Sequence, residues 1–351
     1  MEQANTGTKT KAAGGGGAGG KPLELCDTTN VCARPQCQAT SCRSKCSRCE
    51  QVWYCKAECQ RLDWAFHKAK CKTKEKRAEE KAAGMALVTG SLQGRLALVR
   101  SMLERGTDVN FVTDNGFTAL FAASQEGQLE IVDVLVAAGA LVNWAHKWDG
   151  GTALLIASLN GRHEVIRNLV RAGADVNLAK TDEDASSPLI IAAQNGHVQC
   201  VDILIEAGAR VNYATGKDGY TAMIMASENG HYEVVRSLVR AGADVNQTST
   251  DEYVDSPLIR AAQNGHVQCV DILIEAGAHV NYARGKDGCT ALMIASQQGH
   301  IDVGRSLLAA GADPRHADHN GFTALDIAKH YKHPQIVALL EAKIAELDRS
   351  A

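Results

Sequence analysis

The sequence predicts a mainly α-helical chain in which short helix pairs stack into a solenoid. From residue 82 onward, two series of glycines each recur at steps of 33, 34 or 35 residues. The segments between these glycines carry apolar residues at helical spacing, which is typical of repeated helix pairs. A third observation distinguishes the N-terminal part from the repeats: the segment from Cys46 to Cys71 contains five cysteines and one histidine. That segment is too short to build an apolar core and needs another means of support.

The cysteines and the histidine form three pairs with the spacing of metal ligands. Cys46-x2-Cys49 has the spacing of a zinc knuckle, and Cys55-x3-Cys59 and His67-x3-Cys71 each place two ligands on one helix face. Six soft ligands are too many for one tetrahedral zinc and two short of what two zinc ions need. The missing pair is expected just upstream, where the candidates are Cys26, Cys32, Cys37 and Cys42.

Cys32 and Cys37 are the preferred upstream pair. They leave eight residues before Cys46, which is enough chain to cross between two metal sites. Cys42 leaves only three. Whether Cys26 or Cys42 replaces one of the preferred pair stays open.

The end of this segment resembles the MYND zinc finger family. The resemblance rests on Tyr54-Cys55, Cys59-Gln60, Asp63-Trp64, His67-Lys68 and Cys71. It implies a cross-braced finger with two structural zinc ions, one held by Cys32, Cys37, Cys55 and Cys59 and the other by Cys46, Cys49, His67 and Cys71. The first pair departs from the family, which usually has C-x2-C where this chain has C-x4-C. The resemblance also implies a shallow groove for proline-containing apolar peptides, lined here by Ser47, Gln60 and Trp64.

Two other roles for these cysteines are less favoured. Disulfides would need an oxidising compartment, but residues 1–25 lack the charged start and apolar core of a signal peptide. A catalytic zinc keeps one position open for water, whereas this segment offers enough ligands to close both sites. We therefore expect structural zinc and a location in the cytoplasm, the nucleus or both.

Residues 1–25 are expected to form a disordered glycine-rich tail, followed by the finger over 26–71 and a charged helical linker over 72–83. The tail contains the run AAGGGGAGGKP, which cannot bury enough apolar surface to order itself. The linker is expected to continue the last helix of the finger and to end at Gly84. A run of lysines from Lys68 to Lys76, with Arg77, makes this region basic.

Residues 84–347 resemble ankyrin repeats, in about eight units. Each unit carries [TS]-[AP]-L, as in Thr118-Ala119-Leu120, which places a hydroxyl at a helix start. The resemblance implies an α-solenoid with β-hairpin fingers between units. The histidine that usually follows [TS]-P-L is lost, which predicts apolar contacts at Phe121, Leu155, Ile190, Ile224, Ile259 and Met293, with Asp326 in the last unit. His197, His231, His266 and His300 occupy the usual ankyrin position after a glycine and need no catalytic role.

A duplication indicates where a ligand surface lies. The run QNGHVQCVDILIEAGA occurs at residues 194–209 and again at 263–278, a shift of 69 residues. Nearby finger loops alternate between acidic segments, at 181–184 and 250–253, and lysine-bearing segments, at 216–218 and 285–287. Exposed aromatics beside amides are typical of protein-recognition surfaces. The candidates are Trp144, Trp148, Tyr213 and Tyr282, with an amide row of Gln125, Asn160, Gln194, Asn195, Asn229, Gln263, Asn264, Gln297 and Gln298.

These patterns favour an adaptor with two protein-recognition modules over an enzyme. Cys200 and Cys269 are expected in the core, Cys289 could be exposed in a finger without a base beside it, and no catalytic motif is present. MYND fingers accompany lysine methyltransferase domains, but the repeats leave no room for one. A net charge of −3 argues against nucleic-acid binding, and no apolar run is long enough to span a membrane. We expect protein partners and a monomer; the alternative is a chromatin- or transcription-associated regulator that contacts nucleic acid through the basic linker.

Overall fold

The computed structural model describes residues 44–45, 53–54 and 73–350 of the 351-residue chain. The chain divides into two compact units, Met1–Glu79 and Glu80–Ala351. The predicted tail over residues 1–25 lies outside the described residues, as does most of the predicted finger. No described helix is both long enough and apolar enough to cross a membrane.

In the N-terminal compact unit, Met1–Glu79, two short strands pair as an antiparallel hairpin. β1 (Ser44–Lys45) pairs with β2 (Trp53–Tyr54), with Ser44 opposite Tyr54 and Lys45 opposite Trp53. Two residues per strand give too few ladder hydrogen bonds to be stable alone in water. The hairpin therefore needs support from elsewhere in its unit.

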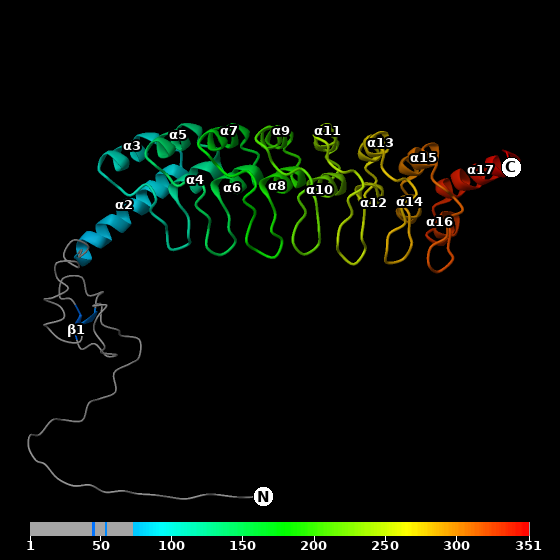
Figure 1. The fold of residues 1–351 in the computed structure, drawn as a ribbon, viewed down its shortest axis with the longest axis horizontal. Coiled ribbons are helices and arrows are strands. Elements are labelled where there is room, and N and C mark those ends of the chain that lie inside the picture. Colours follow the sequence, from blue (N-terminus) through cyan, green and yellow to red (C-terminus); the bar gives the residue numbers. More distant parts are fainter. Residues whose placement is uncertain (1–43, 46–52, 55–72, 351) are drawn as a thin grey trace, which may run out of the picture. The chain divides into compact units, whose positions relative to one another are not determined.

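The second unit is a row of helix pairs, each made of an inner and an outer helix (Figure 1). The inner helices are α2 (Lys74–Leu92), α4 (Ala119–Glu126), α6 (Ala153–Leu159), α8 (Pro188–Gln194), α10 (Ala222–Glu228), α12 (Pro257–Gln263), α14 (Ala291–Gln298) and α16 (Ala324–His330). The outer helices are α3 (Leu96–Glu104), α5 (Leu129–Ala137), α7 (His163–Arg171), α9 (Val198–Glu206), α11 (Tyr232–Arg240), α13 (Val267–Glu275), α15 (Ile301–Ala309) and α17 (Pro334–Ser350). Finger loops project on the side of the inner helices, and three of them contain a single antiparallel bridge.

Stacking between units buries one continuous apolar core. Neighbouring inner helices pack on one another and on their own outer helices, and alanine, leucine, isoleucine and valine side chains fill the spaces between them. A single helix pair exposes its apolar face, so burial is completed only by the next helix pair. The predicted mainly α-helical solenoid is confirmed.

A hydroxyl side chain starts each inner helix from α4 to α12, and also α16. Thr118 Oγ1, for example, accepts a hydrogen bond from the backbone N–H of Phe121, at 3.2 Å. Such a bond satisfies one of the backbone donors that a helix start leaves free. The apolar residues predicted at the position that Phe121 occupies are all buried: Phe121, Leu155, Ile190, Ile224, Ile259 and Met293. Asp326 is exposed and instead completes a capping box with Thr323.

The histidines that follow the glycines connect neighbouring units. His266 Nε2 lies 3.0 Å from the carbonyl oxygen of Glu228, at the end of the preceding inner helix. A carbonyl can only accept, so this nitrogen carries the proton. His197, His231 and His300 make the same contact with the unit before them, and so does His333, which follows Lys332 instead of a glycine.

A second set of bonds between units comes from the asparagine after each glycine turn. Asn246 accepts from the backbone N–H of His279 at 2.8 Å and donates to the carbonyl of Gly277 at 3.2 Å. Asn110, Asn143, Asn177 and Asn281 make the same pair of bonds. These bonds fix the spacing of the turns along the solenoid.

The predicted end of the linker helix at Gly84 is wrong. α2 runs without a break from Lys74 to Leu92 and forms the first inner helix of the solenoid. A β-carbon on Gly84 would lie 2.2 Å from the ring of Phe111. The glycine is thus required by helix packing and does not terminate the helix. At the other end, α17 starts at Pro334 and is the longest outer helix described.

Candidate protein-interaction site

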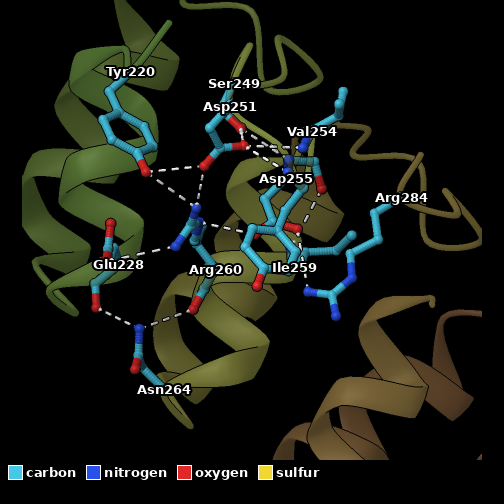
Figure 2. Close-up of polar contacts among 12 residues, drawn as sticks. Tyr220, Glu228, Ser249, Asp251, Val254, Asp255, Ile259, Arg260, Asn264 and Arg284 are labelled. Atoms are coloured by element: carbon cyan, nitrogen blue, oxygen red, sulfur yellow. Dashed lines mark hydrogen bonds and ion pairs between the residues drawn. The ribbon is translucent and has the colours of Figure 1, made fainter. Parts of the chain in front are cut away.

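Charged side chains gather where the finger loop 249–255 meets the inner helices α10 and α12. We call this group the charged cluster; it consists of Tyr220, Glu228, Asp251, Asp255, Arg260, Arg284 and Asp287. Figure 2 shows Arg260 at its centre, between α10 and the loop. Most of the cluster lies in the second copy of the duplicated pair of units, whereas Tyr220 and Glu228 belong to the first copy.

Arg260 connects the finger loop to two inner helices. Its guanidinium group lies 2.8 Å from the Asp251 carboxylate, 3.1 Å from that of Asp255 and 3.8 Å from that of Glu228. The hydroxyl of Tyr220 donates to the same Asp251 oxygen at 3.0 Å. A guanidinium with five fixed donors suits such a convergent set of acceptors.

The two loop carboxyls of the cluster are shifted in opposite directions. Asp255 is only 1% exposed, and burial raises its pKa above the ordinary value although Arg260 and Arg284 oppose the shift. Burial acts the same way on Asp251, but hydrogen bonds from Ser249 and Tyr220 outweigh it and lower its pKa. The opposite directions follow because Asp255 is buried more deeply than Asp251 and accepts fewer hydrogen bonds.

Arg284 reaches the cluster from the next finger. It donates two hydrogen bonds to Asp287, at 2.7 and 2.5 Å, and lies 3.6 Å from Asp255. Its guanidinium also lies 5.1 Å from the ring centre of Tyr253, within the range of a cation–π contact. The paired hydrogen bonds from Arg284 lower the pKa of Asp287 to about 2.

Tyr213 and Tyr282, which were predicted to recognise a partner, mainly hold the finger loops in place through hydrogen bonds. The hydroxyl of Tyr282 donates to the carbonyl of Val254 at 2.8 Å, and Tyr213 makes the same bond to Ala185 at 2.9 Å. Val254 and Ala185 have φ angles of 57° and 47°. Left-handed backbone at a β-branched residue is unfavourable, so the tyrosine bond helps to hold each loop in this form. Both tyrosines are half-buried and not the exposed aromatics that the sequence suggested.

In the first copy, a cavity of about 210 Å³ lies between the fingers and inner helices α8 and α10. Its walls include Asp184, Ser186, Gln194, Thr215, Asp218 and Tyr220. Tyr220 also belongs to the charged cluster, and the bond to Asp251 fixes its ring. Burial and that bond raise the pKa of Tyr220 to about 12, so the hydroxyl stays protonated as a donor.

The predicted aromatic candidates of the first fingers are placed differently from the tyrosines. Trp148 is 59% exposed, with the ammonium of Lys147 4.5 Å from its ring centre. His146 packs edge-on to both Trp148 and the half-buried Trp144 and stacks on Phe117. These rings form a partly exposed aromatic group on neighbouring finger loops.

Much of the predicted amide row has a structural role. Asn160, Asn195 and Asn229 each donate, at 2.8 Å, to the carbonyl four residues earlier and so close the ends of their inner helices. Asn264 donates to Glu228 and Arg260, and Gln297 to Tyr331. Gln194 and Gln298 are exposed. The row is therefore less free to rearrange around a partner than the sequence implied.

The cysteines of the repeats are unsuited to nucleophilic chemistry. Cys200 and Cys269 lie in the core as predicted, and burial raises their pKa values to about 11 and 12. Cys289 lies in a finger where the sequence allowed exposure to solvent, but it is only 8% exposed. Burial and the nearby Asp287 raise its pKa to about 12. All three thiols remain protonated near neutral pH, and the thiolate is the reactive form.

Comparison with protein families identifies the solenoid. A model described as ankyrin repeats matches residues 87–180, 178–249 and 258–350, which together make up well over half of the chain. The chain belongs to the ankyrin-repeat family. A second model, the MYND finger, matches residues 30–71 ahead of the ankyrin array. Ankyrin repeats and MYND fingers both mediate protein–protein interactions, and the MYND finger is a zinc-binding module.

The predicted metal ligands and peptide-groove residues of the MYND finger lie outside the described residues. This holds for Cys32, Cys37, Cys46, Cys49, Cys55, Cys59, His67 and Cys71, and for Ser47, Gln60 and Trp64. Three of these cysteines are close to the described hairpin in the sequence. Cys46 and Cys49 lie between β1 and β2, and Cys55 directly follows β2. Within the ankyrin array as described, no three histidine, cysteine or acidic side chains come together to hold a metal ion.

Similarity to curated proteins is confined to short segments. A segment of 28 residues is 61% identical to N-lysine methyltransferase SMYD2 of Bos taurus and covers 8% of this chain and 6% of that protein. The human SMYD2 is 57% identical over the same length and coverage. Histone-lysine N-methyltransferase ASHR1 of Arabidopsis thaliana is 30% identical over 94 residues, covering 26% of this chain and 19% of that protein. The chain thus spans less than a fifth of these relatives, and the SMYD2 likeness lies in the MYND finger.

Sequence reasoning missed the charged cluster of the ankyrin array, although the duplication contained a signal for it. Shifting the first copy by 69 residues aligns Ser186 with Asp255, Ile191 with Arg260 and Thr215 with Arg284. Three neutral residues thus become one acid and two bases near an otherwise identical segment. Simultaneous gains of opposite charges would have indicated side chains that contact one another.

Proposed function

We propose that this chain is an adaptor that holds protein partners through its MYND finger and through the inner face of its ankyrin array. The inner face is the surface formed by the finger loops and the adjoining inner helices. The observation that carries the proposal is that two protein-interaction modules account for residues 30–71 and 87–350. The exposed Trp148 and the cavity beside Tyr220 offer contact surface on the array.

The proposed role of the finger is to hold short proline-containing apolar peptides. Two zinc ions would support it, one on Cys32, Cys37, Cys55 and Cys59 and the other on Cys46, Cys49, His67 and Cys71. When bound, zinc supplies folding free energy to a segment that is too short to build an apolar core. A donor set of seven thiolates and one imidazole fits two closed tetrahedral sites, and a hairpin with two residues per strand requires such support. Ser47, Gln60 and Trp64 would line the groove, with the indole as a stacking surface for a proline helix.

We further propose that the chain acts without chemistry of its own, as a monomer in the cytoplasm or the nucleus. The buried, protonated thiols of the described repeats support this role. A net charge of −3 favours protein partners over nucleic acid. Proximity labelling in cells would identify both the compartment and the partners.

Affinity capture with matched variants tests the two surfaces separately. Immobilised wild-type chain is compared with Trp64→Ala in the finger and Trp148→Ala in the array. Partners of the finger groove should be lost with Trp64→Ala and retained with Trp148→Ala, because only the first substitution removes the stacking surface. Equal retention of every partner by both variants and the wild type would rule out both surfaces as the sites of binding.

A further inference from the structure

The two copies of the duplicated pair differ where the finger loops meet the inner helices. A shift of 69 residues aligns Lys217 with Lys286 and Asp218 with Asp287 without change. Three neighbouring positions change: Asp184 becomes Tyr253, Ser186 becomes Asp255 and Thr215 becomes Arg284. In the first copy, all five of these positions line the cavity of about 210 Å³.

In the second copy, an arginine of the chain itself fills the equivalent space. Arg284 donates two hydrogen bonds to Asp287, lies 3.6 Å from Asp255 and packs on the ring of Tyr253. These three partners align with Asp218, Ser186 and Asp184 of the first copy. The positions that surround a guanidinium group in the second copy are therefore the positions that line the cavity in the first.

The first copy keeps acidic partners but lacks the arginine. Thr215 is too short to reach across the cavity, and its hydroxyl accepts from the backbone N–H of Tyr220. Within residues 73–350, neither Asp184 nor Asp218 has an ion pair through its side chain. In the second copy, the aligned carboxylate of Asp287 binds the guanidinium of Arg284. In the first copy, Asp218 lines an open cavity.

The neighbouring lysine does not substitute for the missing arginine. In the second copy Lys286 pairs with Glu252 at 2.5 Å, on the finger before it. In the first copy Lys217 lies 3.9 Å from Glu183, the equivalent glutamate. Both lysines are directed to the finger glutamate, which leaves the aspartate of the cavity available for another cation.

We propose that this cavity in the first copy binds an arginine side chain of a protein partner. The proposal rests on the adaptor function and specifies one contact of the ankyrin inner face. A planar guanidinium can donate two parallel hydrogen bonds to Asp218, as Arg284 does to Asp287, whereas a lysine ammonium cannot reproduce that pair. Asp184 adds a second negative charge, and the fixed ring of Tyr220 closes one wall.

Peptide display on the full-length chain tests the proposal. Random peptides are selected on the wild type, and each selected arginine is then replaced by lysine or by citrulline, which keeps the shape but loses the charge. Citrulline is expected to weaken binding by about tenfold or more, and lysine by a smaller factor, because charge-assisted paired hydrogen bonds are lost. The same peptides are measured against the variants of the chain described next.

Three variants place the binding in the cavity. Thr215→Arg places an arginine at the position of Arg284 in the second copy. This side chain should occupy the cavity and abolish binding of the arginine peptides. Asp218→Asn should weaken it by about tenfold. Glu206→Gln removes one exposed negative charge from the outer helix α9, outside the cavity, and should change binding by less than about twofold. Circular dichroism melting establishes that each variant is folded.

Two results would overturn the proposal. One is a selection that yields no arginine-dependent peptide, and the other is an arginine peptide that binds Thr215→Arg as well as the wild type. Peptides that bind elsewhere on the chain would leave the adaptor function in place. Failure of the adaptor function itself is read separately, from the capture experiment with the Trp64 and Trp148 variants.

Discussion

The guanidinium of Arg260 lies 2.8 Å from the carboxylate of Asp251, and both side chains are largely shielded from water. In the first copy of the duplication, the aligned residues are Ile191 and Asp182. There Ile191 is buried, and Asp182 pairs with Lys180 at 3.5 Å on its own loop. The same backbone thus accommodates either an apolar contact or an ion pair at this position.

Replacing Arg260 by isoleucine should destabilise the ankyrin array by about 3 kcal/mol, because it leaves the buried Asp255 without its nearest cation. Urea unfolding of wild type and variant, followed by circular dichroism, measures the loss.

The control for this prediction converts the cluster to the residues of the first copy. The triple variant Asp255→Ser, Arg260→Ile and Arg284→Thr removes the buried acid together with its cations. It should recover at least half of the lost stability, since replacing a whole buried ion group is often nearly neutral. A triple variant that unfolds more easily than Arg260→Ile alone would show that the cluster is not the unit of stabilisation.

Two glycine variants separate backbone strain from contact between units. Gly230 and Gly242 have similar φ angles of +74° and +79°. A β-carbon on Gly230 would lie 2.6 Å from the ring of His266, whereas one on Gly242 meets nothing within 4 Å. Gly242→Ala should cost about 1 kcal/mol from left-handed strain, and Gly230→Ala about 1–3 kcal/mol more from displacement of the histidine. Equal losses in urea unfolding would mean that the histidine contact adds nothing.

The fold could be predicted because its determinants are periodic. Glycines at regular steps and hydroxyls at helix starts recur along the array, and the buried residues at the Phe121 position follow the same pattern up to the last unit. Departures from the pattern were harder to place. Gly84 resembled a helix end, but its contact with Phe111 is remote in sequence, and a contact of that kind has no local signal.

The interaction surface could be predicted only in outline. The sequence indicated the finger loops and Trp148, but the burial of Cys289 and the fixing of Tyr213 and Tyr282 depend on neighbouring units. Whether an aromatic side chain in a loop is free or hydrogen-bonded depends on the backbone that faces it. Position in the repeat therefore predicted a candidate surface, and only the fold showed which side chains are available on it.

Alkaline pH should destabilise the array through its buried thiols. Burial raises the pKa of Cys269 from its ordinary value of 9.0 to about 12. The folded state therefore keeps a proton that the unfolded state releases, so stability is full below pH 9 and falls as pH rises towards 12. The fall is about 1.4 kcal/mol per pH unit for this thiol. Cys269→Ala should show a shallower decline between pH 9 and about 10.5 in urea unfolding.

The control for the thiol prediction is Val270→Ala, which truncates an adjacent buried side chain that does not titrate. It should lose stability at all pH values and keep the pH dependence of the wild type. A Cys269→Ala variant with the same slope as the wild type would contradict the assigned pKa shift.

Metal content distinguishes the candidate ligands of the MYND finger. Elemental analysis of the full-length chain should find about two zinc ions per molecule, because eight donors close two tetrahedral sites. Cys46→Ser should lower the content by about one ion or more. Cys26→Ser and Cys42→Ser are matched controls and should retain both ions if Cys32 and Cys37 complete the set. Loss of zinc in either control would move that cysteine into the ligand set. Chelation should unfold the finger but leave the helical signal of the array intact, since the described repeats contain no metal cluster.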